Sequence, residues 1–213
     1  MRNPFSGLTS NQLFALIALA IGAVLIGLWI SYRSFSVPKP EATNYTLYTP
    51  AEDISAFQLT DSNDRPFTNL SLQGHWTFVY FGFTSCEALC PTTMTLLNNM
   101  YQMLLQKQQN PMPDVVMISI DPDNDTTTKL HDYVTSFNPH FQGATGAKDQ
   151  IQQLASSLNV VYTKIKTTTG YTLDHSGAIM LIDPSGRLIA VFTPPFDAKS
   201  LADDFQGIVS SSG

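Results

Sequence analysis

Cys86 and Cys90 are the only cysteines in the 213-residue sequence, and their spacing could support thiol or metal chemistry. They lie between an aromatic and β-branched run at residues 76–83 and a predicted helix at residues 92–109. A helix N-terminus favours thiolate, the form of cysteine that acts as nucleophile and metal ligand. Residues four apart share one helix face, with Cα atoms about 6 Å apart, which is within disulfide range. We therefore expect the two sulfurs either to bond each other or to share one soft metal ion.

A metal site would need a third ligand, and His175 is the best candidate among the four histidines. Its segment leads directly into an apolar strand predicted at residues 178–182, and a loop at a strand entrance can approach the cysteines. His75 precedes a strand in a turn, His131 belongs to a helix with a polar face, and His140 follows a proline in a loop. These three are interpreted as ordinary exposed or hydrogen-bonded residues.

The elements around these residues predict an α/β domain of the thioredoxin-like type, with the cysteines after a central strand. Two apolar patterns with turn residues between their strands predict hairpins. The alternation of strands and helices lies between them. The predicted order is a hairpin over 54–60 and 67–72, strand 76–83, helix 92–109, strand 115–120, helix 124–137, helix 149–158, strand 160–165, a hairpin over 178–182 and 188–192, and helix 198–209.

The N-terminal part predicts a single transmembrane helix followed by a tether. Residues 13–30 form an uncharged apolar run of eighteen residues, long enough to span a bilayer. The run exceeds the roughly 7–15 residues of a signal-peptide core, so an uncleaved anchor is favoured over a cleaved signal. The predicted divisions are an anchor at 1–33, a tether rich in Pro, Ser and Thr at 34–53, and the thioredoxin-like domain at 54–213.

Composition excludes some partners. The net charge is −6, and Lys and Arg are scattered, whereas nucleic-acid binding normally needs a clustered basic face. Two cysteines also do not make a disulfide-framework scaffold. Charges flanking the apolar run do not fix its orientation, because Arg2 precedes it and Arg33 and Lys39 follow it.

Three motifs in register resemble the Sco/SenC family. They are FGFTSC with CP at residues 81–86 and 90–91, SIDP with DT at 119–122 and 125–126, and DHS before IDPSG at 174–176 and 182–186. The resemblance covers about residues 54–209 and also the arrangement of anchor and tether. It implies a thioredoxin-like fold in which Cys86, Cys90 and His175 bind a copper ion.

The resemblance also implies a function outside the cytosol. The protein would assist assembly of the dinuclear copper centre of cytochrome c oxidase, by delivering copper or by keeping the target cysteines reduced. The expected partner is the copper-receiving oxidase subunit or another copper or thiol protein. The expected location is the bacterial inner membrane or its organellar equivalent, with the domain on the periplasmic side. One departure is Glu87, where the family commonly has Pro; its charge beside the site could raise the thiol pKa or alter affinity.

Four further residues near these motifs have a structural and a ligand interpretation. Asp121 and Asp125 match acidic family positions, yet they also end a strand and cap a predicted helix, and this structural role is favoured over metal contact. Met94 and Met100 offer thioether sulfur, but methionine on a helix stripe is more often core. Both pairs are therefore expected to be structural.

Two other functions use the cysteines alone. A thiol–disulfide oxidoreductase would use Cys86 and Cys90 as a redox pair and would need neither His175 nor metal. A peroxide-reducing enzyme would use one cysteine as the peroxidatic and the other as the resolving residue. This last function leaves His175 unexplained. The favoured interpretation is a metallochaperone rather than an enzyme, with oxidoreductase activity as the alternative.

Overall fold

The structure is a computed structural model that describes residues 10–34, 44–168 and 170–212. The chain divides into two compact units, Met1–Lys39 and Pro40–Gly213. Helix α1 (Ser10–Ser34) belongs to the first unit. Within the part of the chain that the structure describes, no helix has both the length and the apolar character needed to cross a membrane, so the membrane span predicted at residues 13–30 is not supported.

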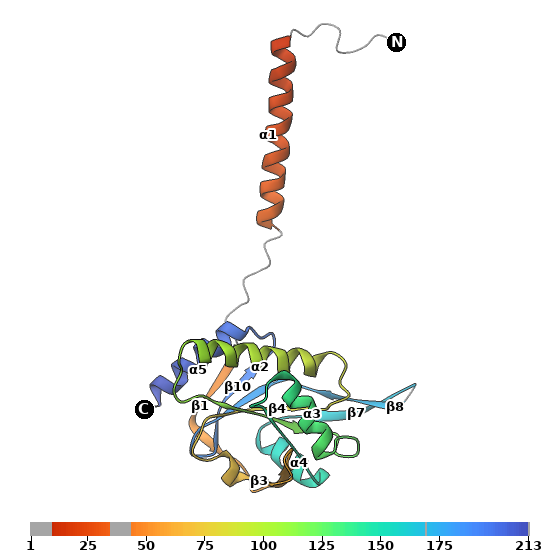
Figure 1. Ribbon diagram of the computed structural model, residues 1–213, viewed down its shortest axis with the longest axis vertical. Helices are drawn as coiled ribbons and strands as arrows, with labels where there is room; N and C mark the ends of the chain where they lie inside the picture. The colour runs from red at the N-terminus through yellow and green to blue at the C-terminus, as the bar shows by residue number, and fades with distance from the viewer. Residues whose placement is uncertain (1–9, 35–43, 169, 213) are drawn as a thin grey trace. The chain divides into compact units, whose positions relative to one another are not determined.

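The second unit is built on an eight-stranded mixed sheet with the strand order β1-β10-β9-β4-β5-β6-β2-β3. Strands β4, β5 and β6 are parallel, and β9 runs antiparallel to β4. Helices α2 and α5 lie along one face of the sheet and α4 lies on the other (Figure 1). This is the predicted thioredoxin-like α/β arrangement. The strands are β1 (Asn44–Asp53), β2 (Gln58–Asp61), β3 (Pro66–Thr68), β4 (Thr77–Gly82), β5 (Asp114–Ser119), β6 (Gln142–Thr145), β9 (Ile179–Ile182) and β10 (Arg187–Thr193).

The central strand and its helix confirm the sequence patterns. All six residues of β4 are buried, as expected for a continuous apolar run covered on both faces. Helix α2 (Leu89–Gln106) buries Met94, Leu97, Met100 and Leu104 along one stripe. Both methionines are fully buried in the core, as their structural interpretation requires. The helix begins three residues before the predicted start, so Cys90 lies inside its first turn.

The remaining predicted elements are present with shifted ends. The two predicted hairpins are antiparallel pairs, β2 with β3 and β9 with β10, although residues 69–72 of the first form a 3-10 helix. Helices α3 (Thr127–Phe137), α4 (Lys148–Ser157) and α5 (Ala198–Ser211) confirm the other helical patterns. Strand β7 (Tyr162–Thr167) confirms the pattern at residues 160–165.

The predicted tether differs from the structure. Residues 44–53 form the edge strand β1, which pairs with β10 through backbone hydrogen bonds. Nearly all of its side chains are exposed, so the strand has no apolar alternation for sequence reasoning to detect. The other predicted tether residues, 35–43, lie outside the described residues.

A separate hairpin carries His175. Strand β7 pairs with β8 (Gly170–His175) in a two-stranded sheet distinct from the main one. His175 is therefore the last residue of a strand, where the sequence predicts a loop. Strand β8 was missed because its polar and aromatic residues show only one buried apolar position, Leu173.

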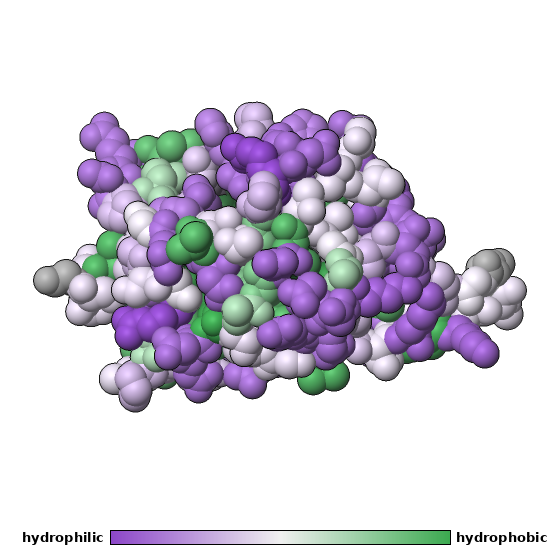
Figure 2. All heavy atoms as spheres, turned by 90° about the horizontal axis from the view of Figure 1, so that it is seen from below, coloured by the Kyte–Doolittle hydropathy of each residue, from purple (hydrophilic) through white to green (hydrophobic). Residues whose placement is uncertain are grey.

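The face seen from below in Figure 2 is largely polar. Hydrophobic side chains gather there in small clusters separated by hydrophilic ones. Large contiguous apolar patches are the usual mark of stable protein interfaces.

Close packing of α3 on β6 predicts a strong effect at Gly143. A Cβ added at Gly143 would lie 2.7 Å from Leu130 Cδ2, and Leu130 is fully buried. We expect Gly143→Ala to lower the free energy of unfolding by about 1–3 kcal/mol, measured by urea denaturation. Gly207→Ala is the matched control, because nothing lies within 4 Å of its added Cβ in α5. Equal stability of the Gly143→Ala variant and wild type would contradict this packing.

Candidate metal centre

The segment carrying both cysteines connects β4 to α2 and is fastened at its start. Thr84 donates two hydrogen bonds to Asp125, from its backbone nitrogen at 2.9 Å and from its hydroxyl at 2.5 Å. Asp125 also accepts a hydrogen bond from Ser119 Oγ at 2.7 Å, and its side chain is buried. The end of β5 thereby holds the residue two positions before Cys86.

Cys90 is the interior sulfur of the pair and Cys86 the outer one. Cys90 is fully buried, whereas Cys86 is partly exposed, and both are free thiols. The backbone nitrogen of Cys90 donates to Cys86 Sγ at 3.3 Å, and Tyr80 Oη donates to Cys90 Sγ at 3.6 Å. Cys86 lies three residues before the start of α2, so the two sulfurs meet through the turn that enters the helix and not through the shared helix face that their spacing predicted.

His175 joins the cysteines from the opposite side of the site. Its Nε2 lies 3.7 Å from Cys90 Sγ. The imidazole packs edge-on against the rings of Tyr80 and Phe83, with centroids 5.8 and 6.3 Å away. Nδ1 or Nε2 of His175 and the two sulfurs all lie within 4.8 Å of one another. Three ligand atoms converge here although 85 residues separate Cys90 from His175.

The chemistry of this donor set fits one soft metal ion. Thiolate sulfur with imidazole nitrogen suits Cu(I) and zinc, and hard oxygen-seeking ions are disfavoured. Three donors spaced evenly around one ion at bonds of about 2.0–2.3 Å lie about 3.5–4 Å from one another. The three donor atoms here lie within 4.8 Å of one another, so side-chain movement can close them on one ion.

Burial controls the protonation of the site. It raises the pKa of Cys90 to about 12, with a further contribution from the hydrogen bond to Cys86. The expectation that the helix N-terminus would favour thiolate at both positions is therefore wrong for Cys90, because desolvation of the charge outweighs the helix dipole. Burial also lowers the pKa of His175. A neutral imidazole keeps a lone pair for a metal.

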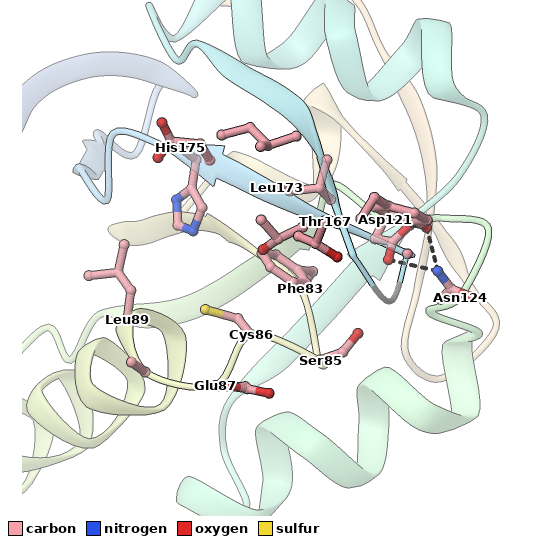
Figure 3. Close-up of a pocket in the computed structure, with 16 residues that line it drawn as sticks. Phe83, Ser85, Cys86, Glu87, Leu89, Asp121, Asn124, Thr167, Leu173 and His175 are labelled. Carbon is pink, nitrogen blue, oxygen red and sulfur yellow. Dashed lines mark hydrogen bonds between the residues drawn. The ribbon is translucent and has the colours of Figure 1, made fainter.

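The site opens into a cavity of about 770 Å³. Figure 3 shows Cys86 and His175 at one end of it, with Asp121 and Asn124 at the other. Apolar Phe83, Leu89 and Leu173 line it together with the carboxylate-bearing Glu87 and Asp174. Cys86 is therefore accessible to solvent through the cavity, whereas Cys90 is buried behind Cys86.

The structure separates the remaining candidates. Among the described residues, Asp121 is not part of the group of ligand atoms at the sulfurs and instead binds Tyr171 and Asn124. Asp125 is not the N-cap of α3, because Thr126 accepts the capping hydrogen bond from Lys129. Glu87 is exposed on the cavity wall.

The other three histidines have partners away from the cysteines or lie on the surface of a helix. His75 pairs with Asp114 at 3.3 Å, and His140 stacks on Tyr101. His131 lies within α3. Within the described residues, the group of potential metal ligands is the one formed by Cys86, Cys90 and His175.

Two residues that sequence reasoning missed complete the site. Tyr80 is buried in β4 and donates to Cys90, and burial raises the pKa of Tyr80, so its hydroxyl keeps the donated proton. Tyr171 lies on β8 and donates to Asp121 at 2.7 Å. An aromatic residue in a strand is more often core, so neither pattern signals such a contact.

The fold and the site together define a thioredoxin-like protein with two cysteines and one histidine at the end of a central strand. Residues 47–210 match the sequence model of the SCO1/SenC family, and this chain belongs to that family.

The chain is similar to family members over most of its length. It is 33% identical to SCO2-like protein RP587 of Rickettsia prowazekii over 195 residues, covering 88% of this chain and 94% of the relative. A crystal structure of Arabidopsis thaliana ScoI with copper bound is 30% identical and superposes with a TM-score of 0.70, covering 74% of this chain and 98% of that one. Bradyrhizobium japonicum ScoI with copper bound is 31% identical, with a TM-score of 0.65, covering 72% and 98%.

Proposed function

We propose that this protein binds one copper ion through Cys86, Cys90 and His175 and acts as a metallochaperone. The observation that carries the proposal is the convergence of these three side chains within 4.8 Å in a member of the SCO1/SenC family. Relatives at about 30% identity have structures with copper bound, which supports copper as the ion. The copper ion would be the cargo that is passed to a thiolate site on another protein. The side chains of Cys86, Cys90 and His175 would hold the ion until then.

The two cysteines have different roles in this proposal. Cys86 lines the cavity and is partly exposed, so an incoming ligand of the acceptor meets it first. Cys90 is buried and hydrogen-bonded by Tyr80, so it holds the ion from inside. The acceptor we propose is the copper-receiving subunit of cytochrome c oxidase, in keeping with the function implied by the family resemblance.

Two measurements test the proposal. X-ray absorption of the Cu(I)-loaded full chain is expected to show two sulfur and one nitrogen scatterers, and a soluble dinuclear-copper domain of an oxidase is expected to acquire copper from it. A loaded chain with sulfur scatterers alone would contradict the ligand set. Retention of all copper by the chain would contradict delivery.

A second function, thiol–disulfide exchange, is supported by the different exposure of the two free thiols. Cys86 thiolate would attack a substrate disulfide and release one substrate thiol. Cys90 would then attack the mixed disulfide at Cys86 and release the second, moving two electrons from this chain to the substrate. A single-turnover assay with an oxidised peptide tests it. Reduction that is unchanged by His175→Ala would support the reductase, and no reduction would exclude it.

We also propose that residues 13–30 anchor the protein in the bacterial inner membrane or its organellar equivalent, with the domain on the non-cytosolic side. The uncharged eighteen-residue run supports this, as do exposed apolar residues of α1 such as Phe14, Leu19 and Leu25. Fractionation followed by alkaline extraction tests the anchor. Release of the chain into the aqueous phase would contradict it.

A further inference from the structure

We propose that Tyr171 is a positioning residue for His175, and that its hydrogen bond to Asp121 latches the β7–β8 hairpin to the domain. The proposal rests on the proposed copper site, and it adds the device that keeps the third ligand in place. Tyr171 and His175 lie four residues apart on the same strand, β8.

The alternation of β8 places both residues on its inner face. Tyr171, Leu173 and His175 are less exposed than Thr172 and Asp174 between them, which are exposed. Side chains two apart on a strand point to the same face. Leu173 lies between Tyr171 and His175 and is buried. Along the inner face of β8, Tyr171 forms the latch, Leu173 packs against the core, and His175 is the proposed ligand.

The hairpin needs such an attachment because it stands apart from the main sheet. Its two strands pair with each other and with no strand of the eight-stranded sheet, as far as the described residues show. Within those residues, the hydrogen bonds from its side chains to the rest of the domain occur at Tyr171 and His175. One of these two attachments involves the proposed ligand itself. The other, at Tyr171, is therefore the one that remains when a metal ion replaces the contact between His175 and Cys90.

The latch is a closed network of three side chains. Tyr171 Oη donates to Asp121 Oδ1 at 2.7 Å, and Asn124 Nδ2 donates to Asp121 Oδ2 at 2.9 Å and also to Tyr171 Oη. Asp121 is buried, with 5% of its surface exposed. The carboxylate raises the pKa of Tyr171 to about 12, so the hydroxyl remains a donor at physiological pH. Lys164 of β7 lies over the Tyr171 ring, 3.3 Å from its centroid, and steadies it.

The latch and the cysteine segment share one support. Asp121 N donates to Ser119 Oγ, Ser119 Oγ donates to Asp125, and Asp125 accepts from Thr84 before the cysteines. The turn between β5 and α3 therefore fixes the His175 strand through Asp121 and the cysteine segment through Asp125. Figure 3 shows Asp121 and Asn124 across the cavity from His175.

The first arm of the test measures the hairpin without copper. In the reduced full-length chain, Tyr171→Phe is expected to increase amide hydrogen exchange in residues 170–175, read by mass spectrometry, while exchange in β4 and α2 stays as in wild type. Tyr162→Phe removes a hydroxyl from the same hairpin outside the network and is the matched control. Unchanged exchange in residues 170–175 would overturn the latch.

The second arm asks whether Tyr171 acts through His175. Tyr171→Phe is expected to weaken Cu(I) affinity roughly tenfold, the lower end of effects for groups that orient metal ligands. In the His175→Ala background the same change is expected to have no effect. An equal loss in both backgrounds would show a general structural effect and overturn the proposal.

A second variant and the two-arm design keep the outcomes separate. Asp121→Asn removes the charge of the acceptor and is expected to raise exchange in residues 170–175 and to weaken Cu(I) affinity, both by less than Tyr171→Phe does. This variant therefore tests the latch even if the Tyr171→Phe chain folds poorly. If wild type itself fails to bind Cu(I), the proposed function fails. The exchange experiment then still decides whether Tyr171 holds the hairpin.

Discussion

Cys90→Ser is expected to lower the Cu(I) affinity of the reduced chain by at least about a hundredfold. Changing groups that only orient ligands commonly costs 10–100-fold, so loss of a ligand sulfur should cost more. Serine offers a hard hydroxyl oxygen in place of soft sulfur. Its position is also buried beside Tyr80 and His175, where solvent cannot supply another ligand. Competition against a chelator of known Cu(I) affinity measures the loss.

Met94→Leu is the matched control for this prediction. Met94 carries the next sulfur along α2, four residues after Cys90, and is fully buried in the core. The exchange roughly conserves volume, so stability should change by less than about 1.5 kcal/mol. Cu(I) affinity should stay at the wild-type value. A large loss with Met94→Leu, or wild-type affinity with Cys90→Ser, would contradict the assignment of the sulfur ligands.

Asp125→Ala is expected to lower the free energy of unfolding by about 2–4 kcal/mol, the largest stability effect we predict. The change leaves the Thr84 backbone nitrogen and the Ser119 hydroxyl without their acceptor, and it removes the buried carboxylate that pairs with Lys129. Because Thr84 starts the cysteine segment, we also expect faster alkylation of Cys90. Urea denaturation and thiol-reaction kinetics measure the two effects.

Asp123→Ala is the control within the same turn. Asp123 pairs with Lys148 on the surface, and exposed ion pairs of this kind contribute little to stability. We expect its unfolding midpoint and the alkylation rate of Cys90 to match wild type. Equal behaviour of the Asp123→Ala and Asp125→Ala variants would show that Asp125 does not fasten the cysteine segment.

The parts of the fold that sequence reasoning predicted well are those with strong local patterns. A continuous apolar run specifies β4, and a stripe at three-and-four spacing specifies α2. The cysteines fall between them, so their place at the strand end followed directly. His175 was identified by its context before an apolar strand, and the structure brings it to the sulfurs.

The parts that escaped prediction depend on contacts between distant residues. Strand β1 is held by backbone pairing to β10 and exposes its side chains, so its composition resembles a tether. Asp125 looked like a helix cap because its local sequence fits one, yet its side chain turns to Thr84, 41 residues away. Tyr171 meets Asp121 across 50 residues. No local pattern encodes such pairs.

The protonation of Cys90 shows a related limit. Its place in the sequence indicates the N-terminal end of a helix, and that feature alone favours thiolate. The fold also surrounds Cys90 with core side chains, and the resulting desolvation raises its pKa to about 12. A copper ion must therefore displace a proton from this sulfur, which a sequence pattern without burial would not reveal.

A Cu(I) competition titration of the reduced full-length chain, comparing wild type with His175→Ala, tests the central claim most directly. We predict one tightly bound copper per wild-type chain and an affinity lower by about a hundredfold in His175→Ala, because one of three converging ligands is lost. Equal affinity of the two proteins, or no firm binding by wild type, would contradict the copper site and leave the Cys86–Cys90 dithiol as the functional group.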